Sequence, residues 1–331
     1  MRALLLLTLI LVGCNKPKPP PAATAPSWND KSEMLYFGIP VRVSFSPDNE
    51  ALANEIWTYL KHVDDVFNDY RADSEISQLN ARQVANSAEL IAALRTSQKA
   101  YQACGGAFDI TVRPLRELWR KAETANVLPT DAEIAGALAR CGMRKLTVTD
   151  DGITLADGAT VDLGGIIKGI AVDHVHGLLA AAGTEAALVQ IGGETMAFGV
   201  SQRDKPHAIG IQHPVDLGDL WAVVRDPGRG FSLSTSGNYR QPIVIDGEEY
   251  YHIFDPRTGK PVPNPVLSVS IFVPEPGQNW LTDSLATTGA VLGPERALAL
   301  ISSQGAEALI LVRDGDEIVE HATAGWPTAP Q

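Results

Sequence analysis

Residues 162–169 place Asp162, two glycines and Lys168 at the point where a predicted strand becomes a predicted helix. Backbone N–H groups and the positive end of a helix dipole face an anion at such a junction. Gly164 and Gly165 let a ligand approach the backbone closely, and the lysine can neutralise a phosphate. The spacing matches neither GxxxxGK[ST] nor GxGxxG, so the segment is either another type of phosphate site or a plain strand–turn–helix junction.

Asp283 and Thr287 stand four residues apart in the predicted helix 280–292, so their oxygens project from one face. A carboxylate and a hydroxyl form part of a coordination shell suited to Mg²⁺, which keeps waters and binds substrate phosphates. The alternative is that Asp283 caps the start of the helix and that Thr287 is an ordinary helix residue. The residue types alone leave both interpretations open.

His252 lies in a predicted strand, 250–254, of mostly large apolar and aromatic residues. A histidine whose imidazole is neutral near pH 7 can accept a proton from a hydroxyl group. A lone histidine in such a strand can equally be a hydrogen-bonded structural residue. A good turn sequence follows at 255–259 on either interpretation.

The segments around these residues have a mixed order of strand and helix patterns. A hairpin is predicted over 145–161 with its turn at 151–152, and the helix that follows it ends at Gly183. The mixed order predicts an α+β fold with largely antiparallel sheets rather than a doubly wound parallel fold. Further strands are predicted at 36–45, 187–191, 207–212, 221–224, 231–234, 266–273, 308–312 and 317–321, and further helices at 87–104 and 294–303.

Local signals give sharper expectations for four connections. Ser46, followed by a proline, is predicted to cap the first helix. Thr130 and Glu133 have the spacing of a capping box for a short helix. Residues 107–111 are predicted to form a short strand, and residues 67–80 a polar connection whose role the composition does not indicate.

Charge and cysteine spacing argue against nucleic-acid binding and against a zinc site. Acidic residues outnumber basic ones by 39 to 27 and no basic cluster occurs, which argues against nucleic-acid binding. Cys104 and Cys141 lie outside any CxxC or Cys/His cluster, which argues against a zinc site. Whether these two cysteines pair in an oxidising compartment stays open, because the sequence does not show that they approach each other.

The N-terminal residues have the pattern of a bacterial lipoprotein. An apolar run at 3–12 is too short to span a bilayer and matches the h-region of a secretory signal peptide. It ends in Leu-Val-Gly-Cys, which looks like a lipobox with Cys14 lipidated; the alternative is an ordinary signal peptide with an incidental cysteine. We therefore expect a signal peptide at 1–13, a membrane-anchored, proline-rich tether at 14–27, and a folded domain at 28–331 on the periplasmic side.

The order of the short motifs along the chain resembles that of the ApbE family, the FAD:protein FMN transferases. The resemblance extends from about residue 37 to at least residue 293. Each motif is modest by itself, but their shared order and spacing are specific. The matching segments are 74–77 with 79–80, 108–114, 162–165 with 168–169, 191–194, 235–239, 252–259, and Asp283 with 285–287.

This resemblance implies an ApbE-like, T-fold-related domain with two lobes. It implies a Mg²⁺-dependent enzyme that cleaves the pyrophosphate of FAD, passes FMN to a Thr or Ser hydroxyl of a membrane electron-transfer protein, and releases AMP. Some relatives mainly hydrolyse FAD, so a pyrophosphatase that produces FMN and AMP is one alternative. A non-catalytic FAD-binding lipoprotein is another, but the presence of Asp283, Thr287 and His252 favours an enzyme.

The resemblance also implies roles for individual residues. Asp283 and Thr287 correspond to Mg²⁺ ligands, together with a backbone carbonyl near Gly165. His252 corresponds to a general base toward the acceptor hydroxyl, so His252 and Asp283 are the expected catalytic residues. Where the family usually has a Met that touches the flavin, this chain has Phe37, whose ring can stack on isoalloxazine or adenine. The alternative is that Phe37 marks an altered nucleotide preference. The residues expected to contact FAD are Phe37, Ala107, Phe108, Asp109, Asp162, Lys168, His252 and Ile253.

Overall fold

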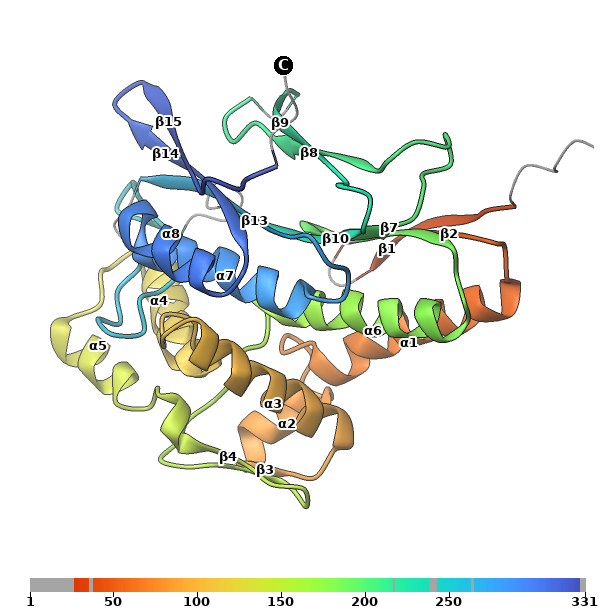
Figure 1. Ribbon diagram of the computed structural model, residues 1–331. Helices are drawn as coiled ribbons and strands as arrows, with labels where there is room; N and C mark the ends of the chain where they lie inside the picture. The colour runs from red at the N-terminus through yellow and green to blue at the C-terminus, as the bar shows by residue number, and fades with distance from the viewer. Residues whose placement is uncertain (1–26, 36–37, 217, 238–242, 263–264, 328–331) are drawn as a thin grey trace, which may run out of the picture.

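The computed structural model describes residues 27–331 except 36–37, 217, 238–242, 263–264 and 328–331, and within these residues the largest element is a sheet of eight strands. Their order is β1-β2-β6-β7-β10-β13-β14-β15, and each neighbouring pair is antiparallel (Figure 1). The predicted α+β class with largely antiparallel sheets is therefore confirmed. The strands are β1 Asn29–Leu35, β2 Ile39–Ser46, β6 Ala186–Ile191, β7 Glu194–Phe198, β10 Phe231–Gly237, β13 Val266–Val273, β14 Glu307–Asp314 and β15 Glu317–Ala322.

Four helices are associated with one face of this sheet. Helices α6 and α7 lie side by side below β7, β10 and β13, with α1 and α8 at their outer sides (Figure 1). Helix α7 packs closely on β13, since a Cβ added to Gly289 would lie 2.6 Å from Cγ1 of Val269. The four helices are α1 Glu50–Phe67, α6 Ile167–Ala181, α7 Asn279–Leu292 and α8 Pro294–Ser303.

A second group of elements lies beyond these helices, on the side away from the large sheet (Figure 1). Its hydrophobic core is continuous with that under α7, because Leu94 of α3 and Leu285 of α7 belong to one buried cluster. Full burial of a leucine contributes about 1.5–3 kcal/mol, so this shared core holds the two groups together. The group comprises α2 Glu75–Arg82, α3 Ala88–Ala103, α4 Arg113–Ala125, α5 Asp131–Leu138, the 3₁₀ turns η1 Ile110–Val112 and η2 Met143–Lys145, and a small sheet of β3 Val84–Ala85, β5 Ile153–Leu155 and β4 Leu146–Val148.

Two hairpins complete the described chain. Strands β8 Ala208–Gln212 and β9 Leu220–Arg225 lie on the face of the large sheet opposite α6 and α7 (Figure 1). Strands β11 Ile243–Ile245 and β12 Glu248–Tyr250 pack against α4. Among the described residues, no helix combines the length and apolar character that crossing a membrane requires.

Several predicted elements are confirmed, and the capping box is one of them. The Thr130 hydroxyl accepts from the Glu133 backbone N–H, and the Glu133 carboxylate accepts from the Thr130 N–H at 2.8 Å. Both Cys104 and Cys141 are buried and free in the part of the chain that the structure describes, so they do not form the disulfide that the sequence left open. Burial raises the pKa of the Cys104 thiol to about 11, which keeps it protonated.

Four local predictions are wrong, each because a side chain caps a helix or a strand ends early. The first helix is capped by Asn49 rather than Ser46, since the Asn49 Oδ1 accepts from Leu52 N at 3.1 Å. Residues 74–80 are not a polar connection, because Ser74 caps helix α2 there. Residues 107–111 do not form a strand but lead into η1, which Asp109 caps.

The fourth correction concerns the predicted strand 250–254. Strand β12 ends at Tyr250, and Phe254 pairs only through an isolated bridge to Pro261. His252 therefore lies in the connection between them, where its side chain is exposed. His252 is therefore not part of an apolar strand, and that strand was the reason for interpreting it as a structural residue.

Candidate active site

A cleft of about 900 Å³ lies between the large sheet with its helices and the second group of elements. Such a volume is at the upper end of the range for small-molecule sites and suits a ligand as large as a dinucleotide. Phe37, the remaining predicted flavin contact, lies outside the described residues. The cleft brings together all the other predicted site residues of the folded domain: Ala107, Phe108, Asp109, Asp162, Gly165, Lys168, His252, Ile253, Asp283 and Thr287.

The start of α6 and the first half of α7 form the polar end of the cleft. The Asp283 carboxylate is 2% exposed and accepts from the backbone N–H of Gly169 at 3.1 Å. It stands four residues after the first residue of α7 and does not cap that helix, so the cap interpretation of Asp283 is wrong. Lys168 Nζ lies 3.6 Å from Oδ2 of Asp283 and 3.3 Å from Oε1 of Glu194. The lysine thus joins two buried carboxylates.

Glu194 is a site residue to which the sequence assigned no role. It begins β7 directly after Gly192-Gly193, is 2% exposed, and lines the cleft. Within the described part of the chain its Oε2 is buried without a hydrogen-bond partner. Burial, and then the nearby Asp283 carboxylate, raise the pKa of Glu194 to about 8 although Lys168 lowers it. The signal available beforehand was an acid directly after two glycines at a strand end, among otherwise apolar residues.

Burial by itself lowers the pKa of Lys168, but the Asp283 and Glu194 carboxylates outweigh that effect and raise it above the ordinary value. Lys168 therefore stays charged in the cleft at neutral pH. A fixed cation at this position can neutralise an anionic ligand. Helix α6 begins at Ile167, so the lysine stands in its first turn, as the phosphate-site interpretation requires.

Gly165 brings its backbone close to the side chains that could hold a cation. A Cβ at this position would lie 3.4 Å from Oγ1 of Thr287 and 3.1 Å from Cε2 of Phe108, so the space suits glycine. The described residues contain no group of three or more His, Cys, Asp or Glu side chains with metal-site geometry. A cation here would be held by a mixed set of oxygens from Asp283, Thr287 and the backbone, which fits Mg²⁺ rather than Zn²⁺.

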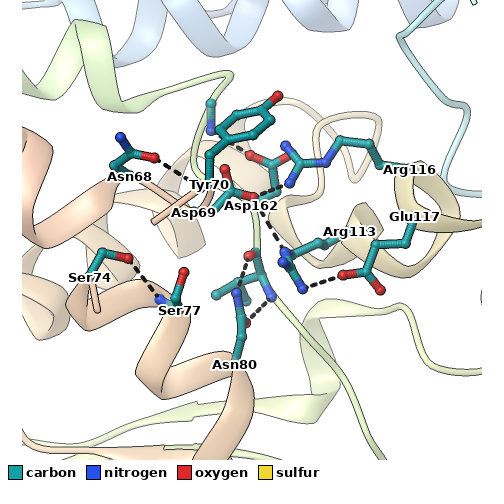
Figure 2. Close-up of polar contacts among 12 residues, drawn as sticks. Asn68, Asp69, Tyr70, Ser74, Ser77, Asn80, Arg113, Arg116, Glu117 and Asp162 are labelled. Atoms are coloured by element: carbon teal, nitrogen blue, oxygen red, sulfur yellow. Dashed lines mark hydrogen bonds and ion pairs between the residues drawn. The ribbon is translucent and has the colours of Figure 1, made fainter. Parts of the chain in front are cut away.

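Asp162 is held by two partners, as Figure 2 shows. Its Oδ1 accepts from Gly164 N at 2.8 Å, and its Oδ2 lies 2.7 Å from Nη1 of Arg116. The same guanidinium contacts Asp69, which also accepts from Arg113 at 3.3 Å. Arg116, from α4, therefore links the segment after α1 to the loop that leads into α6. The sequence did not single out this arginine, because its partners are far away along the chain.

Tyr70 presents an aromatic ring at the cleft. Its backbone N–H donates to Oδ1 of Asn68 at 2.9 Å, which fixes the turn after α1. The guanidinium of Arg120 lies 4.8 Å from the ring centroid and that of Arg116 lies 5.5 Å from it. The side chain is 56% exposed, so the ring can stack on a planar ligand. Tyr70 was part of a segment whose role the sequence did not indicate.

The predicted contact segment 107–109 forms a buried wall of the cleft. Ala107 and Phe108 are each 5% exposed. Asp109 accepts from the backbone N–H of Thr111 at 2.8 Å and from its hydroxyl at 2.6 Å. These bonds fix the direction of the wall, and Oδ1 of Asp109 is already used in capping η1.

A model of the ApbE family matches residues 37–310. The chain belongs to the ApbE family. It is 32% identical over 329 residues to an FAD:protein FMN transferase of Vibrio cholerae, with 96% of this chain and 95% of that protein covered. It is 30% identical over 330 residues to an FAD:protein FMN transferase of Escherichia coli K12, with 95% and 92% covered. The matched range includes every cleft residue named above and begins at Phe37.

Solved structures of ApbE proteins have the same fold. The flavin transferase ApbE of Vibrio cholerae superimposes with a TM-score of 0.76 at 30% identity, covering 90% of this chain and 98% of that one. The apo form of the Pseudomonas stutzeri flavinyl transferase ApbE gives a TM-score of 0.79 at 28% identity, covering 92% and 96%. The predicted ApbE-like fold is therefore confirmed.

Proposed function

We propose that this chain is an FAD:protein FMN transferase, which moves FMN from FAD to the hydroxyl of a Thr or Ser in an acceptor protein and releases AMP. The main support is that one cleft contains both the possible cation ligands and the possible general base. Its lining includes Gly165, Lys168, His252, Asp283 and Thr287. Two similar proteins bear the name of this activity. A cleft of about 900 Å³ also has room for FAD.

The reaction exchanges the phosphoanhydride bond of FAD for a phosphoester bond to the acceptor. The acceptor oxygen forms a bond to the FMN phosphorus while the pyrophosphate P–O bond to AMP breaks, and AMP leaves with the bonding electrons. The hydroxyl proton goes to His252, which is exposed in a loop and can reach an incoming segment. Lys168 neutralises charge on the pyrophosphate from the first turn of α6.

Mg²⁺ is the metal that the oxygens of Asp283, Thr287 and the backbone near Gly165 would hold. When bound, Mg²⁺ stabilises negative charge on the phosphoryl oxygens. The protein contributes a buried carboxylate fixed by Gly169 N, and a glycine that leaves room beside the Thr287 hydroxyl.

The nucleotide parts of FAD would lie along the rest of the cleft. Tyr70 offers an aromatic face at its exposed end, and Phe108 a second ring near Gly165. Asp162, oriented by Arg116 and Gly164 N, supplies a fixed acceptor for hydroxyl or amino groups. Ile253 and Ala107 add apolar wall.

We also propose that the enzyme works on the periplasmic side of a membrane, held by a lipid on Cys14 and a tether at 14–27. The support is the apolar run at 3–12 followed by Leu-Val-Gly-Cys and a proline-rich stretch. Radiolabelled palmitate is expected to label the wild-type chain and not a Cys14→Ser variant. Equal labelling of the two chains would contradict the lipid on Cys14.

The decisive experiment mixes the full-length chain, in detergent, with FAD, Mg²⁺ and an acceptor domain that carries the target threonine. Mass spectrometry should show one FMN on the acceptor, and the modification should require the metal, the threonine and Asp283. Release of free FMN and AMP with an unmodified acceptor would instead support a pyrophosphatase. Recovery of bound, unchanged FAD would support a non-catalytic FAD-binding protein.

A further inference from the structure

Helix α7 begins without a cap of its own. Within the described ranges, its N-cap residue Gln278 makes no side-chain capping hydrogen bond. Two N–H groups of its first turn are instead bound by Asp173, which belongs to α6: Oδ1 accepts from Asn279 N and Oδ2 from Trp280 N, both at 2.8 Å. One carboxylate thus caps a neighbouring helix with both oxygens.

The two helices also touch through Gly169, one turn before Asp173 on the same face of α6. A Cβ at this position would lie 2.3 Å from the carbonyl oxygen of Asn279, so only glycine allows this approach. The Gly169 N–H donates to Oδ2 of Asp283. Contacts at 169 and 173 therefore fix both the distance between the helices and the register of α7 along α6.

Contacts on the other side of α7 hold it to the large sheet. The Asn279 amide donates to the carbonyl of Thr195 at 3.0 Å, and the Thr282 hydroxyl lies 2.7 Å from that of Ser234. These bonds do not involve α6. The carboxylate of Asp173 is the group that ties the first turn of α7 to the helix that carries Lys168.

We propose that Asp173 is a positioning residue of the active site. It does not line the cleft, and it acts by holding α7 so that Asp283 and Thr287 face Lys168 and the Gly165 loop at a fixed separation. This inference rests on the proposed function, because it takes Asp283 and Thr287 as ligands of a divalent cation. The same contacts place Asp283 against Gly169 N. Loss of order in the first turn of α7 would therefore shift the Asp283 carboxylate within the proposed cation site.

The test compares Asp173→Ala with Thr130→Ala in the full-length protein. Both changes remove a side-chain cap from a helix, but Thr130 caps α5 at the surface, away from the cleft. We expect Asp173→Ala to weaken Mn²⁺ binding in the presence of FAD by tenfold or more, measured from the free-ion EPR signal. The Mg²⁺ concentration for half-maximal FMN transfer should rise by a similar factor, while kcat at saturating Mg²⁺ stays within about threefold. Thr130→Ala should leave the Mn²⁺ affinity and the Mg²⁺ concentration for half-maximal transfer unchanged.

A second variant keeps the test decisive if the alanine protein does not fold. Asp173→Asn has the same shape but one oxygen acceptor instead of two, so it should fold and weaken Mn²⁺ binding by at least threefold. Unchanged Mn²⁺ affinity in the folded Asp173 variants would overturn the positioning role. Failure of the wild-type protein to bind Mn²⁺ with FAD would instead count against the metal site of the proposed function.

Discussion

Arg116 Nη1 lies 2.7 Å from Oδ2 of Asp162 at the side of the cleft (Figure 2). The guanidinium also contacts Asp69, and its side chain is only 20% exposed. Because a planar guanidinium binds two carboxylates in fixed directions, it sets the orientation of Asp162 and of the loop that carries Gly165. A contact between α4 and the strand-to-helix junction thereby shapes the proposed FAD site.

The first prediction is that Arg116→Lys weakens FAD binding about tenfold, equivalent to about 1.4 kcal/mol. A lysine keeps the charge but cannot bridge Asp162 and Asp69 in the same geometry. Arg113→Lys is the matched control, since Arg113 contacts Asp69 but not Asp162. FAD affinity is measured by fluorescence titration of the two variants. Equal affinities would show that the Asp162 contact does not matter for FAD.

The second prediction concerns two glycines of α6. Gly169→Ala should reduce the free energy of unfolding by about 1–3 kcal/mol, because its Cβ would overlap the Asn279 carbonyl at 2.3 Å. Gly177→Ala should raise it by about 0.5–1 kcal/mol, since no described atom lies within 4 Å of the added Cβ and alanine favours the helix. Urea unfolding of both variants measures whether the free energy of unfolding changes in opposite directions. An increase in the free energy of unfolding for Gly169→Ala as well would mean that α6 and α7 are not in tight contact.

Sequence reasoning succeeded where one segment contains the whole signal. The capping box of Thr130 and Glu133 and the helix that carries Asp283 needed no information from the rest of the chain. It failed where the cause lies elsewhere in the fold. Asp109 caps a 3₁₀ turn instead of entering a strand, and Glu194 becomes a site residue only because Lys168 and Asp283 pack against it.

The same limit applied to the family resemblance. The ten described residues that it named all line one cleft, because each motif carries its own residues. It gave no role to Tyr70, Arg116 or Asp173, whose contacts are with residues of other elements. Long-range hydrogen bonds and burial leave little trace in local spacing, so such residues are found in the structure.

The third prediction is a pH dependence of stability that Glu194 causes. Its pKa is about 8 in the folded protein against an ordinary value of 4.5, with burial as the main cause. Between these values the folded state binds the proton more tightly than the unfolded state does. The free energy of unfolding should therefore fall as pH rises through this window, by up to about 1.4 kcal/mol per pH unit for one proton.

Glu194→Gln should make that decline shallower. Asp173, whose pKa burial raises to about 7, contributes a fall of the same sign and remains in the variant, so some slope should persist. Urea unfolding at several pH values between 4.5 and 8, with EDTA present, measures both slopes. Parallel curves for wild type and Glu194→Gln would show that Glu194 is ionised in the folded protein across this range.

The last prediction separates chemistry from binding at His252. Because the side chain is exposed in a loop, His252→Ala should fold normally and bind FAD within about threefold of wild type. FMN transfer to the acceptor should fall about 10²–10⁴-fold, the usual contribution of a general base. Single-turnover transfer from preloaded FAD is the measurement, and His62→Ala, a change at an exposed histidine of α1 outside the cleft, is the control. If transfer by His252→Ala stays within threefold of wild type, another group must take the acceptor proton, and our role for His252 is wrong.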